Sequence, residues 1–287
     1  MFNIRYQFIS SVGCVKPLGM SAVHPNARPI DLAGHKGAVL CIHGLSGTPY
    51  EVKPIAVELH RRGYRVLCPL LIGHGRSNQA LANSRWMDWY VSAKRAFEEL
   101  SKDWDEVMIV GFSMGGLIAL KLAHEKGERV KGVAALAPAY ELDYLTALKL
   151  RLVKRFGIGK FLPDFKKRSG PDVSDPDVAA LMPSNDAVPI AAAVSLMDGQ
   201  KAVSEVVSRI ARPVWIFQGK KDHTVPVHSA RHLFSKLKNT NRRLLFYAKS
   251  WHILALDVEH HEVIEDVCDY VDSLFNNGLS VTGEEDA

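Results

Sequence analysis

Short apolar runs alternate with amphipathic stretches along most of this 287-residue chain. The strand-like runs are 37–44, 64–69, 106–112, 130–138, 212–219 and 242–248. The stretches with the apolar spacing of a helix are 50–63, 84–103, 114–127, 229–238 and 258–277. Strands that alternate with helices of this length predict a mostly parallel sheet with helices on both faces, and so the α/β fold class.

The stretch 139–205 interrupts this alternation. It mixes helical pieces with repeated prolines and contains no convincing strand. Because it follows a predicted strand, we expect it to form a helical cap, or lid, over the C-terminal edge of the sheet. The α/β core is then expected to comprise residues 1–138 and 206–277, and residues 278–287 to form a disordered tail.

The composition is that of an ordinary globular chain, with 47% hydrophobic and 23% charged residues. The formal net charge of +5 is mild and, without an RNA-binding or zinc-finger pattern, does not favour nucleic acid as a partner. The four cysteines form no CxxC pair and lack metal-ligand spacing. We therefore expect reduced thiols, a cytoplasmic location and no metal.

Three glycines surround one serine in the stretch VGFSMGG, residues 110–116. Gly111 and Gly115 stand two residues before and after Ser113, between a predicted strand and a predicted helix. A glycine inside a helix costs roughly 1 kcal/mol relative to alanine, so local stability does not explain them. A sharp strand-to-helix turn does explain them, because strand and helix approach closely there. Ser113 is therefore predicted to be the nucleophile of a G-x-S-x-G elbow.

A serine hydroxyl needs an adjacent base, and the expected chain order for such an elbow is serine, acid, histidine. Asp222 follows the predicted strand at 212–219, and His252 follows the one at 242–248. The C-terminal ends of parallel strands lie at one edge of the sheet, where ligands bind. Taken singly, each residue fits an ordinary loop; in this order and at this edge, they are predicted to be the acid and the base.

Two nearby residues have side chains suited to a catalytic base or acid, but their positions in the sequence do not suit these roles. His223 adjoins Asp222 in the same loop and is expected to be a solvent-facing turn residue. Asp257 lies only five positions beyond His252 and is expected to begin the final helix.

Negative charge that develops on a substrate oxygen needs hydrogen-bond donors. The N–H of Met114 directly follows the nucleophile and lies at a helix N-terminus. A second donor is expected from the loop after the first strong strand, where Gly44 and Gly47 permit a tight turn. We expect Leu45 to supply this N–H; the alternative is a plain strand-to-helix turn.

The motifs HGLSGTP, PLLIGHGRS, GFSMGG, GKKDHTVP and SWHI resemble the α/β-hydrolase superfamily, and within it the bacterial carboxylesterases and monoacylglycerol lipases. They lie within about residues 37–275, which is most of the chain. The resemblance implies the α/β-hydrolase fold and no cofactor. The site residues that it implies are the triad Ser113, Asp222 and His252 and the oxyanion-hole N–H groups of Leu45 and Met114.

The resemblance implies a serine hydrolase that cleaves carboxylic esters of short- to medium-chain acyl groups through an acyl-enzyme. The alternatives are a thioesterase or carbon–carbon bond hydrolase with the same triad, and a non-catalytic ligand-binding protein of the same fold. Trp251 departs from the pattern, because relatives usually carry glycine before the histidine; we expect it to narrow the pocket beside the base. The oligomeric state is left open.

Apolar residues recur with helical spacing within residues 144–162. They are Leu145, Leu148, Leu152 and Phe156, and the basic residues among them are Lys149, Arg151, Lys154 and Arg155. We expect the apolar stripe to face the pocket above Ser113, with Leu148 and Leu152 contacting substrate. The basic residues favour a solvated cap helix, and a weak contact with a membrane surface or lipid is the alternative.

Overall fold

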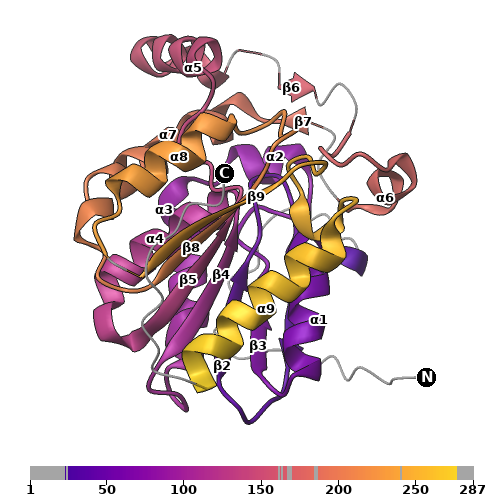
Figure 1. Cartoon of the computed structure of the whole chain (residues 1–287). Helices are drawn as coiled ribbons and strands as arrows, with labels where there is room; N and C mark the ends of the chain where they lie inside the picture. The colour runs from indigo at the N-terminus through magenta and orange to yellow at the C-terminus, as the bar shows by residue number, and fades with distance from the viewer. Residues whose placement is uncertain are drawn as a thin grey trace.

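The computed structural model describes residues 25–160, 164–166, 170–183, 187–239 and 241–276, together with Val23 and Leu162. The described residues form a seven-stranded sheet in the order β1-β3-β2-β4-β5-β8-β9 (Figure 1). Its strands are β1 (Ile30–Leu32), β2 (Ala38–Ile42), β3 (Arg65–Cys68), β4 (Val107–Phe112), β5 (Val130–Leu136), β8 (Val214–Gly219) and β9 (Arg242–Tyr247). Strand β1 pairs antiparallel with β3, and the other neighbours pair parallel.

Helices cover both faces of this sheet, which confirms the predicted fold class (Figure 1). One face carries α1 (Lys53–Arg61) and α9 (His260–Asn276), and the other carries α3 (Trp86–Leu100), α4 (Met114–Lys126) and α8 (Val227–Lys236). Short 3-10 helices join several elements; they are η1 (Pro25–Ala27), η2 (Pro49–Val52), η3 (Gly127–Arg129), η5 (Val207–Arg209) and η6 (Leu254–Leu256).

Alternate residues of the central strands face two separate cores. In β2, Leu40 and Ile42 belong to the core beneath α3, α4 and α8, whereas Val39 and Cys41 belong to the core beneath α1 and α9. All four side chains are fully buried. Burial on both faces explains why these strands are continuous apolar runs instead of alternating ones.

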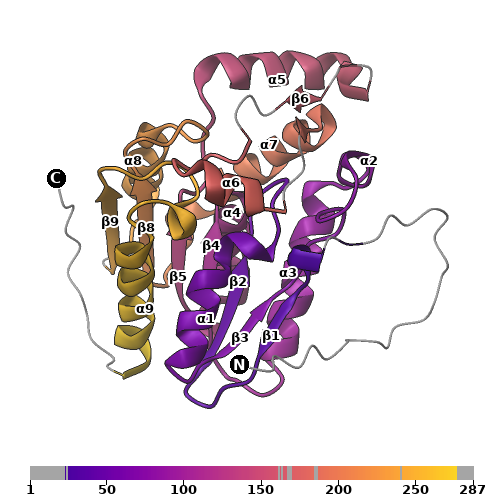
Figure 2. The ribbon, with the colours of Figure 1, turned by 90° about the vertical axis from the view of Figure 1, so that its right-hand side faces the viewer.

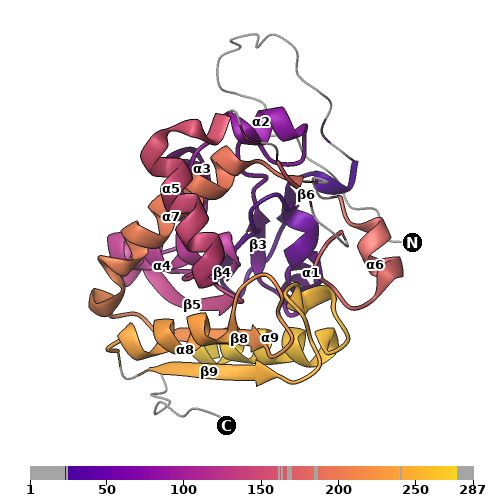
Figure 3. The same ribbon diagram turned by 90° about the horizontal axis from the view of Figure 1, so that it is seen from above.

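Six described elements between β5 and β8 lie above the C-terminal edge of the sheet (Figure 2). They are α5 (Tyr144–Phe156), η4 (Ile158–Lys160), β6 (Phe165–Lys166), α6 (Pro176–Leu181), β7 (Ala187–Val188) and α7 (Ile190–Ser204). Seen from above, α7 crosses over α4, on which it packs, and α5 packs on α7 (Figure 3). We call residues 139–205 the insert.

The structure differs from the sequence predictions in four elements or boundaries. The insert contains a two-residue antiparallel pair, β6 with β7, where no strand was expected. Strand β1 and the short helix α2 (Asn78–Ala82) were not predicted, because both are too short for a periodic pattern. The final helix begins at His260, after Asp257. The predicted tail, residues 278–287, and Cys14 lie outside the described residues.

Candidate active site

Ser113 occupies the sharp turn between β4 and α4. Its φ of 54° and ψ of −114° are unusual for a residue other than glycine, and such strain is held only by the surrounding structure. The backbone N–H of Ser113 donates to Leu136 O at 2.8 Å, which ties the turn to β5. A Cβ on Gly111 would stand 2.3 Å from Gly115 O, and one on Gly115 would stand 2.2 Å from Ile42 O. Larger residues at either position would therefore displace the turn.

Ser113, His252 and Asp222 form a continuous hydrogen-bonded row. His252 Nε2 lies 3.1 Å from Ser113 Oγ, and His252 Nδ1 lies 2.7 Å from Asp222 Oδ2. Ser113 is only 7% exposed, and the side chain of Asp222 is fully buried. The structure thus brings together the three residues that the sequence predicts. With Nδ1 donating to the carboxylate, Nε2 is free to accept the serine proton.

The loop after β8 holds the Asp222 carboxylate in place. Its Oδ1 accepts the backbone N–H groups of Thr224 at 2.8 Å and Val225 at 2.7 Å. Its Oδ2 also accepts from Gln218 Nε2 at 2.9 Å. These donors satisfy a buried charge that would otherwise be costly. Gln218 was not predicted, because a glutamine inside a strand carries no sequence signal for this role.

The acid and the base shift each other's proton affinity. Burial alone would raise the pKa of Asp222, but the charge of His252 and the hydrogen bonds to the carboxylate hold that pKa below its usual value. Burial alone would lower the pKa of His252, but the charge of Asp222 and its hydrogen bond raise that pKa above its usual value. The pair therefore favours a carboxylate beside an imidazole that readily accepts a proton.

The loop after β2 lies against the first turn of α4. Residue Ile42 pairs with Gly111 in the sheet, so His43 and Gly44 lie beside the serine turn. Gly44 leaves room for the Phe112 ring, since a Cβ there would stand 3.1 Å from it. Leu45 is half-buried, and Met114 is fully buried as the first residue of α4.

His43 fixes the orientation of the Gly44–Leu45 peptide. The backbone N–H of Leu71 donates to His43 Nε2 at 3.1 Å, so Nε2 must be unprotonated. A neutral ring then carries its proton on Nδ1, which donates to Gly44 O at 2.9 Å. Because this peptide bond is trans, the N–H of Leu45 points opposite to the Gly44 carbonyl that His43 holds.

Burial keeps His43 in this neutral form. It lowers the pKa of His43 to about 4, although the hydrogen bond to Gly44 acts in the opposite direction. The ring of His74 packs edge-on against His43, with centroids 4.9 Å apart. The N–H of Gly44 is also held, since it donates to the buried Glu51 carboxylate at 2.9 Å. Both polar groups of Gly44 are thus fixed by side chains; the sequence predicted a tight turn and the Leu45 donor here, but not these side-chain contacts.

Trp251 and His223 lie together beside the base. Their rings meet edge-on with centroids 4.6 Å apart, and Trp251 is half-buried. His223 is exposed to solvent, as expected, and its Nδ1 lies 3.0 Å from Asp172 of the insert. That Trp251 narrows a substrate pocket remains a prediction.

Asp257 does not begin the final helix, and this prediction is wrong. It lies between η6 and α9, is only 1% exposed, and its carboxylate accepts the backbone N–H of Trp251. It also accepts from the N–H of Ser174 at 3.1 Å and that of Val258 at 2.8 Å. Asp257 therefore holds the backbone before His252 through its carboxylate. The position of Asp257 in the sequence did not indicate this role.

The apolar stripe of α5 differs from its expected orientation. Leu150 is buried, whereas Leu148 is 39% and Leu152 48% exposed. Lys154 forms an ion pair with Asp198 of α7, so the face with Leu150 and Lys154 is the one that contacts the body of the protein. Two residues along a helix correspond to about 200°, which places Leu148 and Leu152 on the opposite face. The sequence predicted that they would line the pocket above Ser113, but both side chains are exposed and form no buried wall there.

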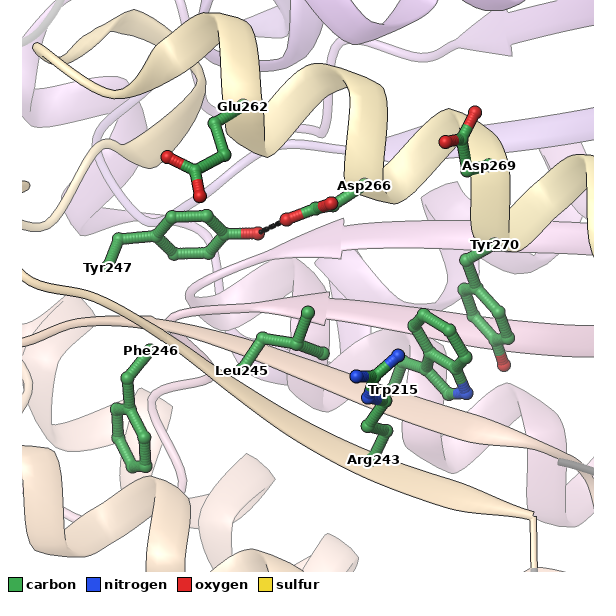
Figure 4. A pocket seen from close by; sticks show the side chains of 9 residues that line it. All are labelled: Trp215, Arg243, Leu245, Phe246, Tyr247, Glu262, Asp266, Asp269 and Tyr270. Carbon is green, nitrogen blue, oxygen red and sulfur yellow. Dashed lines mark hydrogen bonds between the residues drawn. The ribbon is translucent and has the colours of Figure 1, made fainter. Parts of the chain in front are cut away.

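A cavity of about 410 Å³ lies elsewhere, between β9 and α9 (Figure 4). Its lining residues are Trp215, Arg243, Leu245, Phe246, Tyr247, Glu262, Asp266, Asp269 and Tyr270. Tyr247 donates to Asp266 at 2.7 Å, and the Arg243 guanidinium lies over the Trp215 ring. No serine or histidine lines this cavity, so it offers no nucleophile and base of the kind found at Ser113.

Metal-binding clusters and membrane-spanning helices are both absent from the described ranges. No group of three or more His, Cys, Asp or Glu residues there could hold a metal ion. None of the helices described combines the length and apolar character that crossing a bilayer requires.

Comparison with known proteins points to one class of enzyme. A family model described as serine aminopeptidase S33 (Hydrolase_4) matches residues 33–259. The chain is 27% identical to a thermostable monoacylglycerol lipase of Bacillus sp. (strain H-257), over 86% of this chain and 96% of that one. It is 26% identical to a carboxylesterase of Bacillus subtilis, over 89% and 99% of the two chains. The solved structure of a metagenome-derived lipolytic enzyme superposes with a TM-score of 0.81 at 25% identity, covering 88% of this chain and 100% of that one.

Proposed function

Because the chain belongs to the serine aminopeptidase S33 family of hydrolases, we propose that it is a serine hydrolase of carboxylic esters that works through an acyl-enzyme. The observation that carries this proposal is the row Asp222–His252–Ser113, with contacts of 2.7 and 3.1 Å at the edge of the sheet. The relatives named above, a monoacylglycerol lipase and a carboxylesterase, support an ester as the substrate.

The geometry supports a two-step reaction. His252 Nε2 takes the proton from Ser113 Oγ as that oxygen attacks the ester carbonyl carbon, and Asp222 stabilises the imidazolium. The imidazolium then protonates the leaving alkoxide, which departs as the alcohol and leaves an acyl group on Ser113. Water, deprotonated by the same His252, attacks the acyl carbon; the acid then leaves as Ser113 Oγ is expelled and takes the proton back from His252.

The oxyanion of each tetrahedral intermediate requires two N–H donors. We assign them to Met114, at the N-terminus of α4, and to Leu45. The assignment of Leu45 rests on the Gly44–Leu45 peptide, whose carbonyl is held by His43 at 2.9 Å. Removal of one such donor typically lowers kcat by about 10²–10³-fold.

The acyl group is proposed to be of short to medium length, with the insert acting as a lid above the site. Assays on p-nitrophenyl esters of increasing chain length test this assignment. Highest kcat/KM on a long-chain ester would contradict it.

Three other activities could use the same row of residues: thioester hydrolysis, carbon–carbon bond hydrolysis and, given the description of the family, release of N-terminal amino acids. Acyl thioesters, a β-diketone and aminoacyl p-nitroanilides, assayed beside acyl esters, distinguish these. Higher kcat/KM for any of them than for every ester would overturn the ester assignment.

A non-catalytic protein of this fold would carry an unreactive serine. A fluorophosphonate probe phosphonylates only an activated serine, so we expect one adduct on the wild-type chain and none on Ser113→Ala. An adduct-free wild type would support the non-catalytic alternative.

The exposed stripe of α5 favours contact with a lipid surface over a merely solvated cap. Leu145 and Phe156 are exposed together with Leu148 and Leu152, and exposed apolar patches of this kind mark interaction surfaces. The basic side chains beside them are also exposed; they are Lys149, Arg151 and Arg155. We propose that this face of α5 rests on anionic lipid, where an ester of low solubility would be found.

A cytoplasmic location is part of the proposal. Cys41, Cys68 and Cys268 are free thiols in the folded chain, and reducing compartments keep thiols in this form. Fractionation of cells that express the tagged protein tests the location.

A further inference from the structure

A short segment of the insert lies against both loops that carry the acid and the base. This segment, residues 171–174, contains the buried Val173, which belongs to the same core as Ile253 and Leu254 of the base loop. We call it the strap. It belongs to neither loop, and some 50 residues separate it from Asp222 in the sequence.

Asp172 of the strap contacts both loops at once. Its carboxylate accepts the backbone N–H of His223 at 3.1 Å and the hydroxyl of Thr224 at 2.7 Å, and these residues directly follow Asp222. Its backbone carbonyl accepts the N–H of Ile253 at 3.1 Å, directly after His252. The Asp172 side chain is only 15% exposed.

Ser174 of the strap adds a second connection to the base loop. Its N–H and its hydroxyl both donate to the Asp257 carboxylate. The same carboxylate accepts the N–H of Trp251, the residue before His252. The backbone N–H groups of the residues on both sides of His252 are therefore bonded to the strap, that of Ile253 directly and that of Trp251 through Asp257.

The strap acts at the tips of the two loops. Where the loops leave the sheet, Lys220 N–H donates to Tyr247 O at 2.8 Å and Lys221 N–H donates to Ser250 O at 3.2 Å. These bonds fix the bases of the loops but leave their outer ends to other contacts. The strap contacts the two loops beyond these bonds, at His223 and Thr224 after Asp222 and at Ile253 after His252.

We propose that Asp172 is a positioning residue of the active site, which aligns the acid loop with the base loop and so makes activation of Ser113 depend on the placement of the strap. This inference rests on the proposed serine hydrolase function. A misplacement of about 1 Å in a catalytic group can cost about 100-fold in rate, so a contact that never touches substrate can govern catalysis.

Asp172 also contributes to the charge around the base. Carboxylates on three elements raise the pKa of His252 through their charge: Asp222 in the loop after β8, Asp172 in the strap, and Glu51 in η2. Each favours the protonated imidazole. Loss of the Asp172 charge therefore lowers the pH at which His252 becomes protonated, and a purely structural support would not have this effect.

The test compares Asp172→Ala and Asp172→Asn with the control Asp175→Ala. The control removes the same charge from the same part of the insert, where Asp175 caps α6 by accepting from Asp177 and Val178. The rate of phosphonylation of Ser113 by a small fluorophosphonate is measured against pH, together with kcat and KM on a soluble short-chain ester. Circular dichroism checks the fold of each variant.

We expect Asp172→Ala to react about 10- to 100-fold more slowly with the probe, with kcat reduced much more than KM. Asp172→Asn keeps an acceptor oxygen, so its phosphonylation rate should fall less. The acid limb of its pH–rate profile, where His252 becomes protonated, should nevertheless move to lower pH. If Asp172→Ala does not fold, Asp172→Asn alone decides through this shift. The control should match wild type in rate and in pH profile.

Two results would overturn the inference and leave the proposed function intact. One is wild-type reactivity and an unmoved acid limb in both Asp172 variants. The other is an equal loss of rate in the Asp175 control. A wild-type chain that does not react with the probe would instead contradict the proposed function, and this inference with it.

Discussion

His43 offers a direct test of the oxyanion assignment, because its two ring nitrogens can be replaced one at a time. Nδ1 holds the Gly44 carbonyl, and Nε2 accepts the N–H of Leu71. The amide nitrogen of asparagine can stand near Nδ1, whereas the side-chain oxygen of glutamine can stand near Nε2. His43→Asn should therefore keep the bond to the peptide, and His43→Gln should keep the bond to Leu71 and release the peptide.

The two variants lose different hydrogen bonds of the His43 ring. His43→Asn leaves the N–H of Leu71 without its partner, and His43→Gln leaves the Gly44 carbonyl with only the longer bond from Gly47 N–H at 3.3 Å, so each should lose about 1–3 kcal/mol of stability. Only His43→Gln removes the shorter of the two bonds to the Gly44 carbonyl, and so loosens the Gly44–Leu45 peptide and lets the N–H of Leu45 turn away. Loss of one oxyanion donor is worth about 2.7–4 kcal/mol in the transition state, so kcat of His43→Gln should fall by about 10²–10³-fold. His43→Asn should retain most of its kcat.

The assay is hydrolysis of a soluble short-chain p-nitrophenyl ester, with kcat corrected for the fraction of active sites by fluorophosphonate titration. KM should change little, because the donor binds the transition state more tightly than the ground state. Urea unfolding provides the control, since comparable stabilities exclude unfolding as the cause of a difference. Equal kcat losses, or a larger loss in His43→Asn, would refute the argument that His43 orients the peptide.

The remaining predictions concern the acid, the base and the insert. Asp222→Asn should lower kcat by about 10⁴-fold because the wrong imidazole tautomer is held, and Asp257→Asn should cost less; the reverse ranking in a p-nitrophenyl ester assay would refute the acid assignment. The pKa of His252 is raised, and the base must be neutral to accept a proton. Wild-type kcat/KM should therefore rise with pH, with a midpoint above the ordinary histidine pKa of about 6.5. A midpoint below that value in the pH–rate profile would count against the pairing of His252 with Asp222. Leu148→Ala combined with Leu152→Ala should weaken sedimentation with anionic vesicles and slow hydrolysis of a vesicle-bound monoacyl ester but not of a soluble one; equal loss on both substrates would show that the stripe serves the active site instead.

The sheet could be predicted from the sequence because its strands are buried on both faces. Runs such as 106–112 contain little but apolar residues, and the helices between them supply the crossovers that parallel strands need. Strand β1 was missed because it spans only Ile30–Leu32 and is partly exposed at the edge of the sheet.

The candidate site was predictable where its residues directly follow predicted strands. Ser113, Asp222 and His252 each follow a strand, so parallel topology brings them together. Asp257 and Asp172 were not found, because their partners are distant in sequence: the contact from Ser174 to Asp257 spans 83 positions. No local pattern distinguishes such a carboxylate from one on the surface.

The apolar stripe on α5 shows a second limit of prediction from the sequence, which concerns the orientation of a helix. Periodicity correctly shows that Leu148 and Leu152 share one face of a helix that Asp143 caps and Gly157 ends. It does not show toward which side that face turns. The orientation was decided by the packing of Leu150 and Lys154 on α7, which is a tertiary contact.

The most direct test of the central claim is mass spectrometry of the chain after treatment with a fluorophosphonate. The wild-type chain should gain one adduct, located by peptide mapping on Ser113, and lose esterase activity in proportion. Ser113→Ala should gain none and should hydrolyse a p-nitrophenyl ester about 10⁴-fold or more slowly, with an unchanged circular dichroism spectrum. An adduct on another residue, or a Ser113→Ala variant as active as wild type, would contradict the claim that this serine is the nucleophile.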